Sequence, residues 1–215
     1  LKRTFESIKI QKFNDFEWVV ADGNSSDGTQ DWLASLDDAF LRWKSEEDKG
    51  IFDGMNKGLS RATGDYLIFM NSGDIFASGE VLSRVAKEMG ETDCFVYGDS
   101  LDLSPGGTEL YRKSKSHSLL YRGMFTQHQA MFYRRDRLKG QQYRLEYPVT
   151  ADYAFTAEYL HKCNEKEIHY LGFPVCKFLL GGTNESARFK ALKEDYRIRR
   201  KIIGTGFIKA SVLYF

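Results

Sequence analysis

A short polar sequence that follows an apolar run in the first half of the chain has side chains that could do chemistry. Tyr66–Met70 consists of apolar and aromatic residues, as in a strand buried on both faces, and Asn71-Ser72-Gly73-Asp74 follows directly. Ligands bind at the carboxyl ends of strands in open α/β sheets, so these polar groups are candidates for a site. Asp74 supplies a carboxylate beside a residue without a side chain, as a divalent metal holding a diphosphate requires. The alternative is an ordinary hydrophilic turn.

A second candidate loop, Asp22–Gly28, also follows an apolar run and precedes a predicted helix. Backbone N–H groups at a helix start attract phosphates, and Asp22 adds a carboxylate to them. A calcium loop is a rival interpretation, because potential ligands alternate at Asp22, Asn24 and Ser26. However, Asp27 stands where a calcium loop requires Gly, and Leu33 stands where it requires Glu. The loop therefore favours a phosphate-bearing ligand over calcium.

Charged and amide side chains also gather around the predicted start of the next helix, in Glu46–Gly58. The candidates in this segment are Lys49, Asp53, Asn56 and Lys57. Asp53 and Asn56 are three residues apart, so they share one face of the helix. Taken alone, such charges are typical of a solvated helix start, which the helix dipole favours.

His128 and Gln129 precede a predicted strand and could line a pocket for an acceptor or contact a diphosphate. A structural role is the alternative for a His outside any metal-ligand pattern. The other three histidines also lack ligand spacing and are interpreted as structural or surface residues: His117, His161 and His169.

The elements that must position these residues alternate between strands and helices. Strands are predicted over 16–21, 41–44, 66–70, 94–103, 108–113, 130–134, 168–171 and 175–180. Helices are predicted over 1–10, 29–36, 51–62, 79–89, 152–161, with Thr150 as cap, and 188–203, before an apolar tail. The regular alternation up to Asp93 indicates a Rossmann-like α/β half, and Pro105-Gly106-Gly107 indicates a hairpin after it.

Composition narrows the class of protein. The 215 residues include 31 Lys and Arg and 30 Asp and Glu, a formal net charge of +1, so the chain lacks the basic excess of a nucleic-acid-binding protein. Cys94, Cys163 and Cys176 show no C-x-x-C spacing, which suggests a reducing compartment without a disulfide framework or zinc site. No signal peptide and no apolar run of about 20 residues is visible, so we expect a cytoplasmic location.

In order and spacing, these segments resemble glycosyltransferase family 2. The resemblance rests on D-G-N-S-S-D-G-T, E-D-K-G-I-F-D-G-M-N-K-G and A-T-G-D-Y-L-I-F-M-N-S-G-D, and later on T-Q-H-Q-A-M-F-Y, T-A-D-Y and F-L-L-G-G-T-N. It covers nearly the whole chain and is strongest to bacterial transferases of the colanic acid and exopolysaccharide type. Six ordered motifs make a chance match improbable, whereas one would be weak evidence.

The resemblance implies a GT-A fold, with a mixed, mostly parallel sheet flanked by helices and a smaller hairpin region on the acceptor side. It divides one domain into a nucleotide-binding half (1–93), an acceptor half (94–187) and a basic helix with tail (188–215). The implied reaction is inverting, metal-dependent transfer of a sugar from a UDP- or GDP-sugar to a saccharide acceptor. The acceptor would be lipid-linked, and the pathway would be bacterial surface polysaccharide synthesis. The alternative is a catalytically silent subunit of the same fold that binds nucleotide sugars or serves in assembly.

The same resemblance implies roles for single residues. Asp22 would hold the nucleotide base, and Lys49 would lie near the base or phosphates. Asp74 would bind Mg²⁺ or Mn²⁺, with Asn71 at the ribose or phosphate, although Gly73 stands where many members have Asp. The remaining nucleotide-sugar candidates are Asn24, Asp53, Asn56, Ser72 and Gly73. Asp152 falls at the catalytic base, and one base is what an inverting displacement requires.

Three further expectations concern the ends of the chain. The family's first strand would precede Leu1, and we expect it upstream because a sheet without it leaves backbone groups unpaired. The alternative is a sheet that lacks this strand and in which nucleotide binding is compromised. The basic helix 188–203 is either a solvated face of a packed amphipathic helix or a surface that contacts an anionic membrane. The loop Gly181-Gly182-Thr183 would close on the product side.

Overall fold

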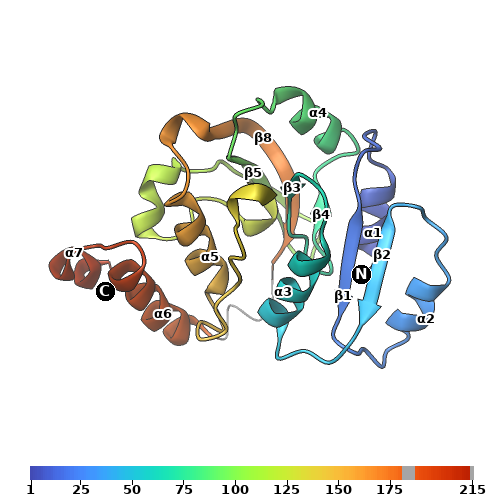
Figure 1. Ribbon diagram of the computed structural model, residues 1–215, viewed down its shortest axis with the longest axis horizontal. Coiled ribbons are helices and arrows are strands. Elements are labelled where there is room, and N and C mark those ends of the chain that lie inside the picture. Colours follow the sequence, from blue (N-terminus) through green and yellow to red (C-terminus); the bar gives the residue numbers. More distant parts are fainter. Residues whose placement is uncertain (181–186, 214–215) are drawn as a thin grey trace.

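The structure, a computed structural model, describes residues 1–180 and 187–213 and contains two separate sheets (Figure 1). A parallel pair is formed by β1 (Trp18–Asp22) and β2 (Leu41–Ser45). The six-stranded sheet has the order β3-β7-β5-β8-β4, with β6 paired to β5. Its strands are β3 (Tyr66–Leu67), β4 (Ile75–Phe76), β5 (Phe95–Leu103), β6 (Glu109–Arg112), β7 (Met131–Arg134) and β8 (Ile168–Leu179). The predicted hairpin is confirmed as β5–β6.

Every predicted helix is present. The α-helices are α1 (Lys2–Lys9), α2 (Thr29–Ala34), α3 (Ile51–Arg61), α4 (Val81–Glu88), α5 (Ala151–Leu160), α6 (Arg188–Lys201) and α7 (Phe207–Val212). Short 3-10 helices span His117–Arg122, His128–Ala130, Arg135–Arg137 and Glu165–Glu167. The segment predicted as an apolar tail thus contains α7, and the last two predicted strands are one strand, β8. Gly181–Thr183, the predicted product-side loop, lies outside the described residues.

The sheet is mixed, as predicted, but it is less parallel than expected. The pairs β1–β2 and β5–β8 are parallel, whereas β3–β7, β4–β8, β5–β6 and β5–β7 are antiparallel. Every antiparallel pair contains β6, β7 or β8, and a short turn joins β5 to β6. The parallel neighbours β5 and β8 are instead joined by a long connection that includes α5, as parallel strands require.

The strand predicted over Tyr66–Met70 is shorter than expected and is not buried on both faces. Strand β3 covers only Tyr66–Leu67, and Leu67 is the one buried residue of the five. Strand β3 pairs only with β7 among the described strands, and β1 likewise pairs only with β2. A strand without a neighbour on one side stays partly exposed and irregular. The strand that the family pattern places before Leu1 stays a prediction.

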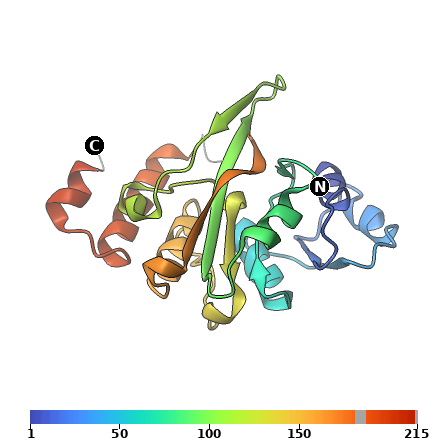
Figure 2. The ribbon, with the colours of Figure 1, turned by 90° about the horizontal axis from the view of Figure 1, so that it is seen from above.

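Two apolar layers cover the six-stranded sheet, and the alternation of side chains along β5 and β7 separates them. Phe95, Tyr97 and Tyr133 lie in the layer that α5 and α6 cover. Val96 and Phe132 point to the opposite layer, which α1 and α4 cover. Figure 2 shows these helices on the two sides of the sheet. The sheet thus forms a rigid base for the loops at its edge.

The cysteines depart from the expectation. Cys94 and Cys163 are joined by a disulfide with their Cα atoms 6.0 Å apart, whereas Cys176 is free and buried. The two partners are 69 residues apart, and no spacing signal links them. They meet because the end of α5 lies beside the start of β5. The prediction of a chain without disulfides is therefore wrong, and the reducing compartment inferred from it loses its support.

Candidate functional site

The loops after β1 and β2 and the segment that leads into α5 lie along one edge of the molecule, at the bottom of Figure 1. Parallel pairing of β1 with β2 brings the ends of these two strands together, because Asp22 is the register partner of Ser45. The candidate residues Asp22, Lys49 and Asp152 all belong to these segments. The fold therefore brings the predicted nucleotide loops and the predicted base to one edge.

Asp22 is a buried carboxylate that the end of β2 and the following loop hold in place. Its Oδ2 accepts hydrogen bonds from Ser45 Oγ at 2.6 Å and from the Ser25 N–H at 3.0 Å. Burial raises the pKa of Asp22, but the hydrogen bonds from Ser25 and Ser45 outweigh burial, so the pKa lies below its ordinary value. Asp22 is thus ionised and fixed at neutral pH. Asn24, in a left-handed conformation with φ of 63°, is exposed beside it.

Asp48 packs between the Asp22 loop and the start of α3, and no sequence pattern singled it out. Its Oδ1 accepts a hydrogen bond from the Gly50 N–H at 2.8 Å. Its Oδ2 lies so close to Gly23 that a Cβ atom there would be 2.6 Å away, and a Cβ on Gly54 would be 3.2 Å away. A Cβ atom at Gly23 would force the Asp48 carboxylate to move, and one at Gly54 would crowd it. The sequence signal that could have indicated this contact is Gly54, a glycine in the interior of α3.

The other candidates at the start of α3 differ in what they contact. The carboxylate of Asp53 accepts the Lys49 N–H at 3.0 Å and lies 3.6 Å from Lys57 Nζ, so it stabilises the first turn. The amide of Asn56 donates to the Tyr143 carbonyl at 3.0 Å and accepts the Tyr143 N–H at 2.7 Å. Asp53 and Asn56 therefore fix the helix, and their binding roles stay predictions. Lys49 is exposed and free to reach a ligand.

The turn Asn71–Asp74 does not fit a divalent metal as the structure has it. Asp74 is only 4% exposed; its Oδ2 accepts from Gln129 Nε2 at 2.6 Å and its Oδ1 from the Leu179 N–H at 3.0 Å. Burial raises the pKa of Asp74, because the buried site disfavours the ionised carboxylate that a metal ligand needs. Asn71 and the exposed Ser72 add only neutral donors, and Gly73 adds none. Within residues 1–180 and 187–213, no three acidic, His or Cys side chains converge on a metal-sized site.

His128 and Gln129 are buried, so their predicted contacts with an acceptor or diphosphate have no support in the structure. The ring of His128 lies between two tyrosine hydroxyls, with Nε2 2.7 Å from Tyr143 and Nδ1 3.2 Å from Tyr133. Burial lowers the pKa of His128 to about 3, so the ring is neutral at physiological pH. Gln129 binds Asp74. The histidine forms part of the aromatic core, and the glutamine fixes the turn.

Asp152 lies in the first turn of α5 and remains partly exposed. Its Oδ1 accepts the N–H of Tyr153 at 2.9 Å. Burial, supported by the charge of Glu194 and opposed by the Tyr153 N–H, raises the pKa of Asp152 to about 6. A carboxylate whose pKa lies close to neutral can both accept and release a proton near physiological pH.

Glu194 fixes the start of α5 from the neighbouring helix α6, and no sequence pattern distinguished it among the basic residues of that helix. Its carboxylate is 4% exposed and accepts hydrogen bonds from the N–H groups of Val149 and Thr150, both at 3.0 Å, and from Thr150 Oγ1 at 3.1 Å. Thr150 occupies the predicted cap position, but its hydroxyl donates to Glu194 and makes no cap bond to α5. The turn before Asp152 therefore depends on α6.

Replacing Glu194 by Gln is expected to shift the acid limb of the pH profile of kcat/KM to lower pH. The negative charge of Glu194 raises the pKa of Asp152, so a neutral amide in its place lowers that pKa. Sugar-transfer rates from pH 5 to 8 measure the shift. The matched control is Glu91→Gln, which removes an exposed charge elsewhere. An acid limb that stays in place in both variants would contradict the coupling.

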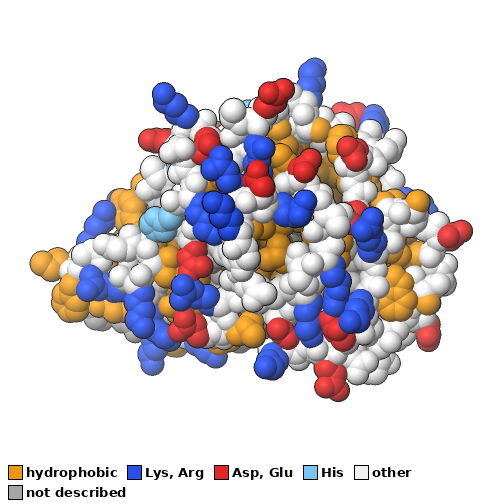
Figure 3. Space-filling view, in the orientation of Figure 1, with side chains coloured by type: hydrophobic (Ala, Val, Ile, Leu, Met, Phe, Trp, Pro, Cys, Tyr) orange, Lys and Arg blue, Asp and Glu red, His pale blue; other side chains and the backbone are white. Residues whose placement is uncertain are grey.

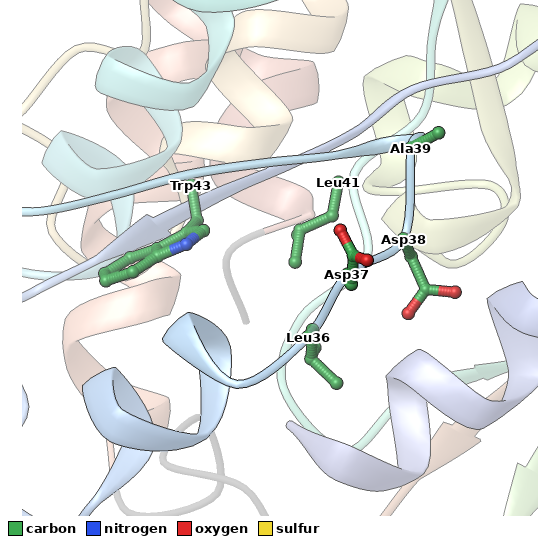
Figure 4. A pocket seen from close by; sticks show the side chains of 6 residues that line it. All are labelled: Leu36, Asp37, Asp38, Ala39, Leu41 and Trp43. Carbon is green, nitrogen blue, oxygen red and sulfur yellow. The ribbon is translucent and has the colours of Figure 1, made fainter.

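A separate hollow of about 290 Å³ lies beside β2, and none of the candidate residues lines it (Figure 4). Its lining residues come from the end of α2 to β2: Leu36, Asp37, Asp38, Ala39, Leu41 and Trp43. Asp38 is paired with Lys9 at 3.3 Å. The hollow is a surface depression apart from the site.

Comparison with known proteins decides the family. The sequence profile of "Glycosyl transferase family 2" matches residues 1–160. The chain belongs to glycosyltransferase family 2. A curated relative, the PGL/p-HBAD biosynthesis glycosyltransferase of Mycobacterium bovis, is 35% identical over 168 residues, which cover 72% of this chain and 62% of the relative. The GalNAc(5)-diNAcBac-PP-undecaprenol beta-1,3-glucosyltransferase of Campylobacter jejuni is 31% identical over 105 residues, covering 47% of this chain and 34% of that enzyme.

Solved structures confirm the fold of this family 2 chain. S. aureus TarS 1-349 in complex with UDP superposes with a TM-score of 0.70 at 17% identity, covering 99% of this chain and 64% of that one. The mannosyltransferase PcManGT from Pyrobaculum calidifontis, in complex with GDP-Man and Mn²⁺, gives a TM-score of 0.66 at 15% identity, covering 99% and 63%. The predicted GT-A α/β fold is therefore confirmed. The likeness to colanic acid transferases and the roles of single residues stay predictions.

Proposed function

We propose that this family 2 chain transfers a sugar from a nucleotide-diphosphate sugar to a saccharide acceptor, with Asp152 as the general base. The observation that carries the proposal is Asp152, a partly exposed residue whose carboxyl group has its pKa raised by burial to about 6, at the same edge as the fixed Asp22. The chain spans about three fifths of the length of its mycobacterial relatives, which are glycosyltransferases. Their names and the UDP complex of TarS support the reaction class.

The proposed chemistry is a single displacement with inversion at the anomeric carbon. An acceptor hydroxyl forms the new C–O bond and loses its proton to Asp152, while the bond from the anomeric carbon to the diphosphate breaks and the nucleoside diphosphate leaves. A retaining double displacement would need a carboxylate nucleophile beside the anomeric carbon. The sugar transferred, the linkage and the acceptor depend on pocket shape.

Asp22 and Lys49 are proposed to hold the nucleotide. The ionised Asp22 can accept hydrogen bonds from the base or ribose, and the Lys49 ammonium can contact the phosphates at the start of α3. The bound UDP and UDP-GlcNAc of TarS and the GDP-Man of PcManGT support a UDP- or GDP-sugar. The alternative of a catalytically silent subunit predicts the same binding without turnover.

Use of Mg²⁺ or Mn²⁺ is a separate part of the proposal. The Mn²⁺ in the PcManGT complex supports it. The turn around Asp74 gives it no support, because the carboxylate is buried and already accepts two hydrogen bonds. The comparison of Mn²⁺ with EDTA in the titration below tests metal use directly.

A lipid-linked acceptor is proposed because the Campylobacter relative acts, by its name, on an undecaprenol-linked glycan. This acceptor would bring the enzyme to the inner face of the plasma membrane, as expected for bacterial surface polysaccharide synthesis. In the described ranges, no helix is both long and apolar enough to span a membrane.

Calorimetric titration with UDP and with GDP, each with Mn²⁺ and with EDTA, tests the nucleotide site. We expect one nucleotide to bind, and Asp22→Ala to weaken binding by about tenfold or more, because it removes a charged hydrogen-bond acceptor worth about 1.5–3 kcal/mol. Asp15→Ala, at an exposed position outside the site, is the control. Failure of both nucleotides to bind would refute the proposal, and binding without turnover on lipid-linked acceptors would favour the silent subunit.

A further inference from the structure

Helices α6 and α7 form one end of the molecule, on the left in Figure 1. Each helix is anchored by a buried side: Ile198 of α6 and Ala210 of α7 are fully buried. Arg199, 3% exposed, donates to the carbonyls of Tyr121 and Arg122 at 3.1 and 3.2 Å. The helix pair is therefore packed in a defined orientation, and its outer side chains have fixed positions.

The outer side of α7 exposes large apolar side chains. Phe207, Ile208 and Val212 are 64%, 78% and 71% exposed. Ile208 and Val212 are four residues apart and lie one above the other on the helix. The opposite side faces the protein, since the Lys209 ammonium lies 3.6 Å from the centre of the Tyr121 ring. Figure 3 shows apolar side chains gathered at this end of the molecule. Exposed apolar clusters of this kind mark interaction sites.

Cations without a carboxylate partner lie along α6 and on α7. Residues 187–213 contain eight Lys and Arg but only two acidic residues, whereas the whole chain is nearly balanced. Both acidic side chains face the protein: Glu194 binds the start of α5, and Asp195 pairs with Arg199 at 3.4 Å. Six cations form no ion pair with any described carboxylate: Arg188, Lys190, Lys193, Arg200, Lys201 and Lys209. Figure 3 shows a row of Lys and Arg next to the apolar end.

We propose that α6 and α7 dock this protein on an anionic membrane, with Phe207, Ile208 and Val212 in the interface and the cations of α6 at the lipid headgroups. Apolar side chains beside unpaired Lys and Arg on a short helix pair are the chemistry of an interfacial anchor. Arg200 combines both elements, because its guanidinium lies 5.9 Å from the centre of the Phe207 ring. A nucleic acid would use the cations but would leave the three apolar side chains exposed.

The docking surface is connected to the candidate active site through α6. Glu194, on the buried side of this helix, holds the turn immediately before Asp152. A membrane-bound α6 therefore sets the orientation of the Asp152 edge relative to the lipid surface. The docking itself is independent of the transfer reaction, so vesicle binding can be tested on a protein that has no detectable activity.

Flotation of the full chain with vesicles of phosphatidylcholine alone, and of phosphatidylcholine with 30% phosphatidylglycerol, tests the docking. We expect binding only to the anionic vesicles and its loss at 0.5 M salt, since screening shortens the reach of the charges. Reversal of three cations, Lys190→Glu with Lys193→Glu and Lys201→Glu, is expected to weaken binding by about tenfold or more. The matched control reverses Lys87, Lys113 and Lys139, which are exposed, lie outside α6 and α7, and form no ion pair with any described carboxylate.

Removal of the exposed apolar side chains of α7 tests the second part of the proposal, their insertion into the membrane interface. Ile208→Ser with Val212→Ser is expected to weaken vesicle binding by about tenfold or more, whereas Leu110→Ser with Tyr111→Ser, at exposed apolar positions of β6, leaves binding unchanged. Equal binding to both kinds of vesicle would overturn the proposal. So would control variants that weaken binding as much as the α6 and α7 variants do. The proposal would also be overturned if the wild type bound no vesicles and light scattering showed a dimer that Ile208→Ser with Val212→Ser dissociates.

Discussion

Asp152→Asn is expected to lower kcat/KM for sugar transfer by about 10²- to 10⁴-fold, the range that a general base contributes. Nucleotide affinity is expected to stay unchanged, because Asn keeps the shape of the side chain and can still accept the Tyr153 N–H. Transfer from the nucleotide sugar that binds in calorimetry, measured beside the nucleotide titration itself, checks both parts. Asp15→Asn, an exposed carboxylate outside the site, is the control.

The pH profile gives the same prediction a second readout. The base acts when it is ionised, so wild-type kcat/KM is expected to fall as pH drops through about 6, the pKa of Asp152, and this limb is expected to vanish in Asp152→Asn. Unchanged transfer in the variant, or a retained limb near pH 6, would show that another group is the base.

Stability should change in the opposite direction to activity. The pKa of Asp152 is raised above its unfolded value, so ionisation of Asp152 at pH 7 destabilises the folded state, and protonation between about pH 6 and 4 removes that penalty. The Asn variant is therefore expected to unfold at a higher temperature than wild type at pH 7. The difference should shrink toward pH 4.

Local sequence patterns predicted most of the elements, because each element has its own periodicity. The turn residues Pro105-Gly106-Gly107 between two strand-like segments correctly predicted the hairpin of β5 and β6. The loop at Asp22 was also predictable, because a carboxylate followed by turn formers ends an apolar strand. Features that depend on one short segment and its immediate neighbours were therefore visible without the structure.

Features that depend on contacts between distant segments could not be predicted from the sequence. Glu194 lies in a helix dominated by Lys and Arg, and its role depends on the turn at Val149 and Thr150. The pairing of Cys94 with Cys163 depends on how α5 returns to β5. Side-chain direction is equally invisible: Asp74 has the residue type of a metal ligand, but the fold turns its carboxylate inward.

That inward orientation makes Asp74→Ala the substitution with the largest expected effect on stability. The change leaves the Leu179 N–H and the Gln129 amide without their acceptor at a site that is 4% exposed. Each unsatisfied buried donor costs about 1–3 kcal/mol, so we expect a loss of about 3 kcal/mol in the free energy of unfolding. For a chain of this size that loss lowers the melting temperature by about 10 °C, which differential scanning calorimetry measures.

Asp74→Asn separates this structural role from the metal-ligand role that the family pattern implies. The Asn oxygen can still accept the Leu179 N–H, and rotation of the Gln129 amide offers an oxygen to the new NH₂ group, so most of the stability should return. A structural Asp74 predicts that this variant binds nucleotide as wild type does, with Mn²⁺ and with EDTA alike. A metal ligand predicts a different pattern, because a neutral amide holds a divalent cation more weakly than a carboxylate. If Mn²⁺-dependent nucleotide affinity falls equally in the Asn and Ala variants while their melting temperatures stay near wild type, Asp74 binds the metal, and the turn must open to let it do so.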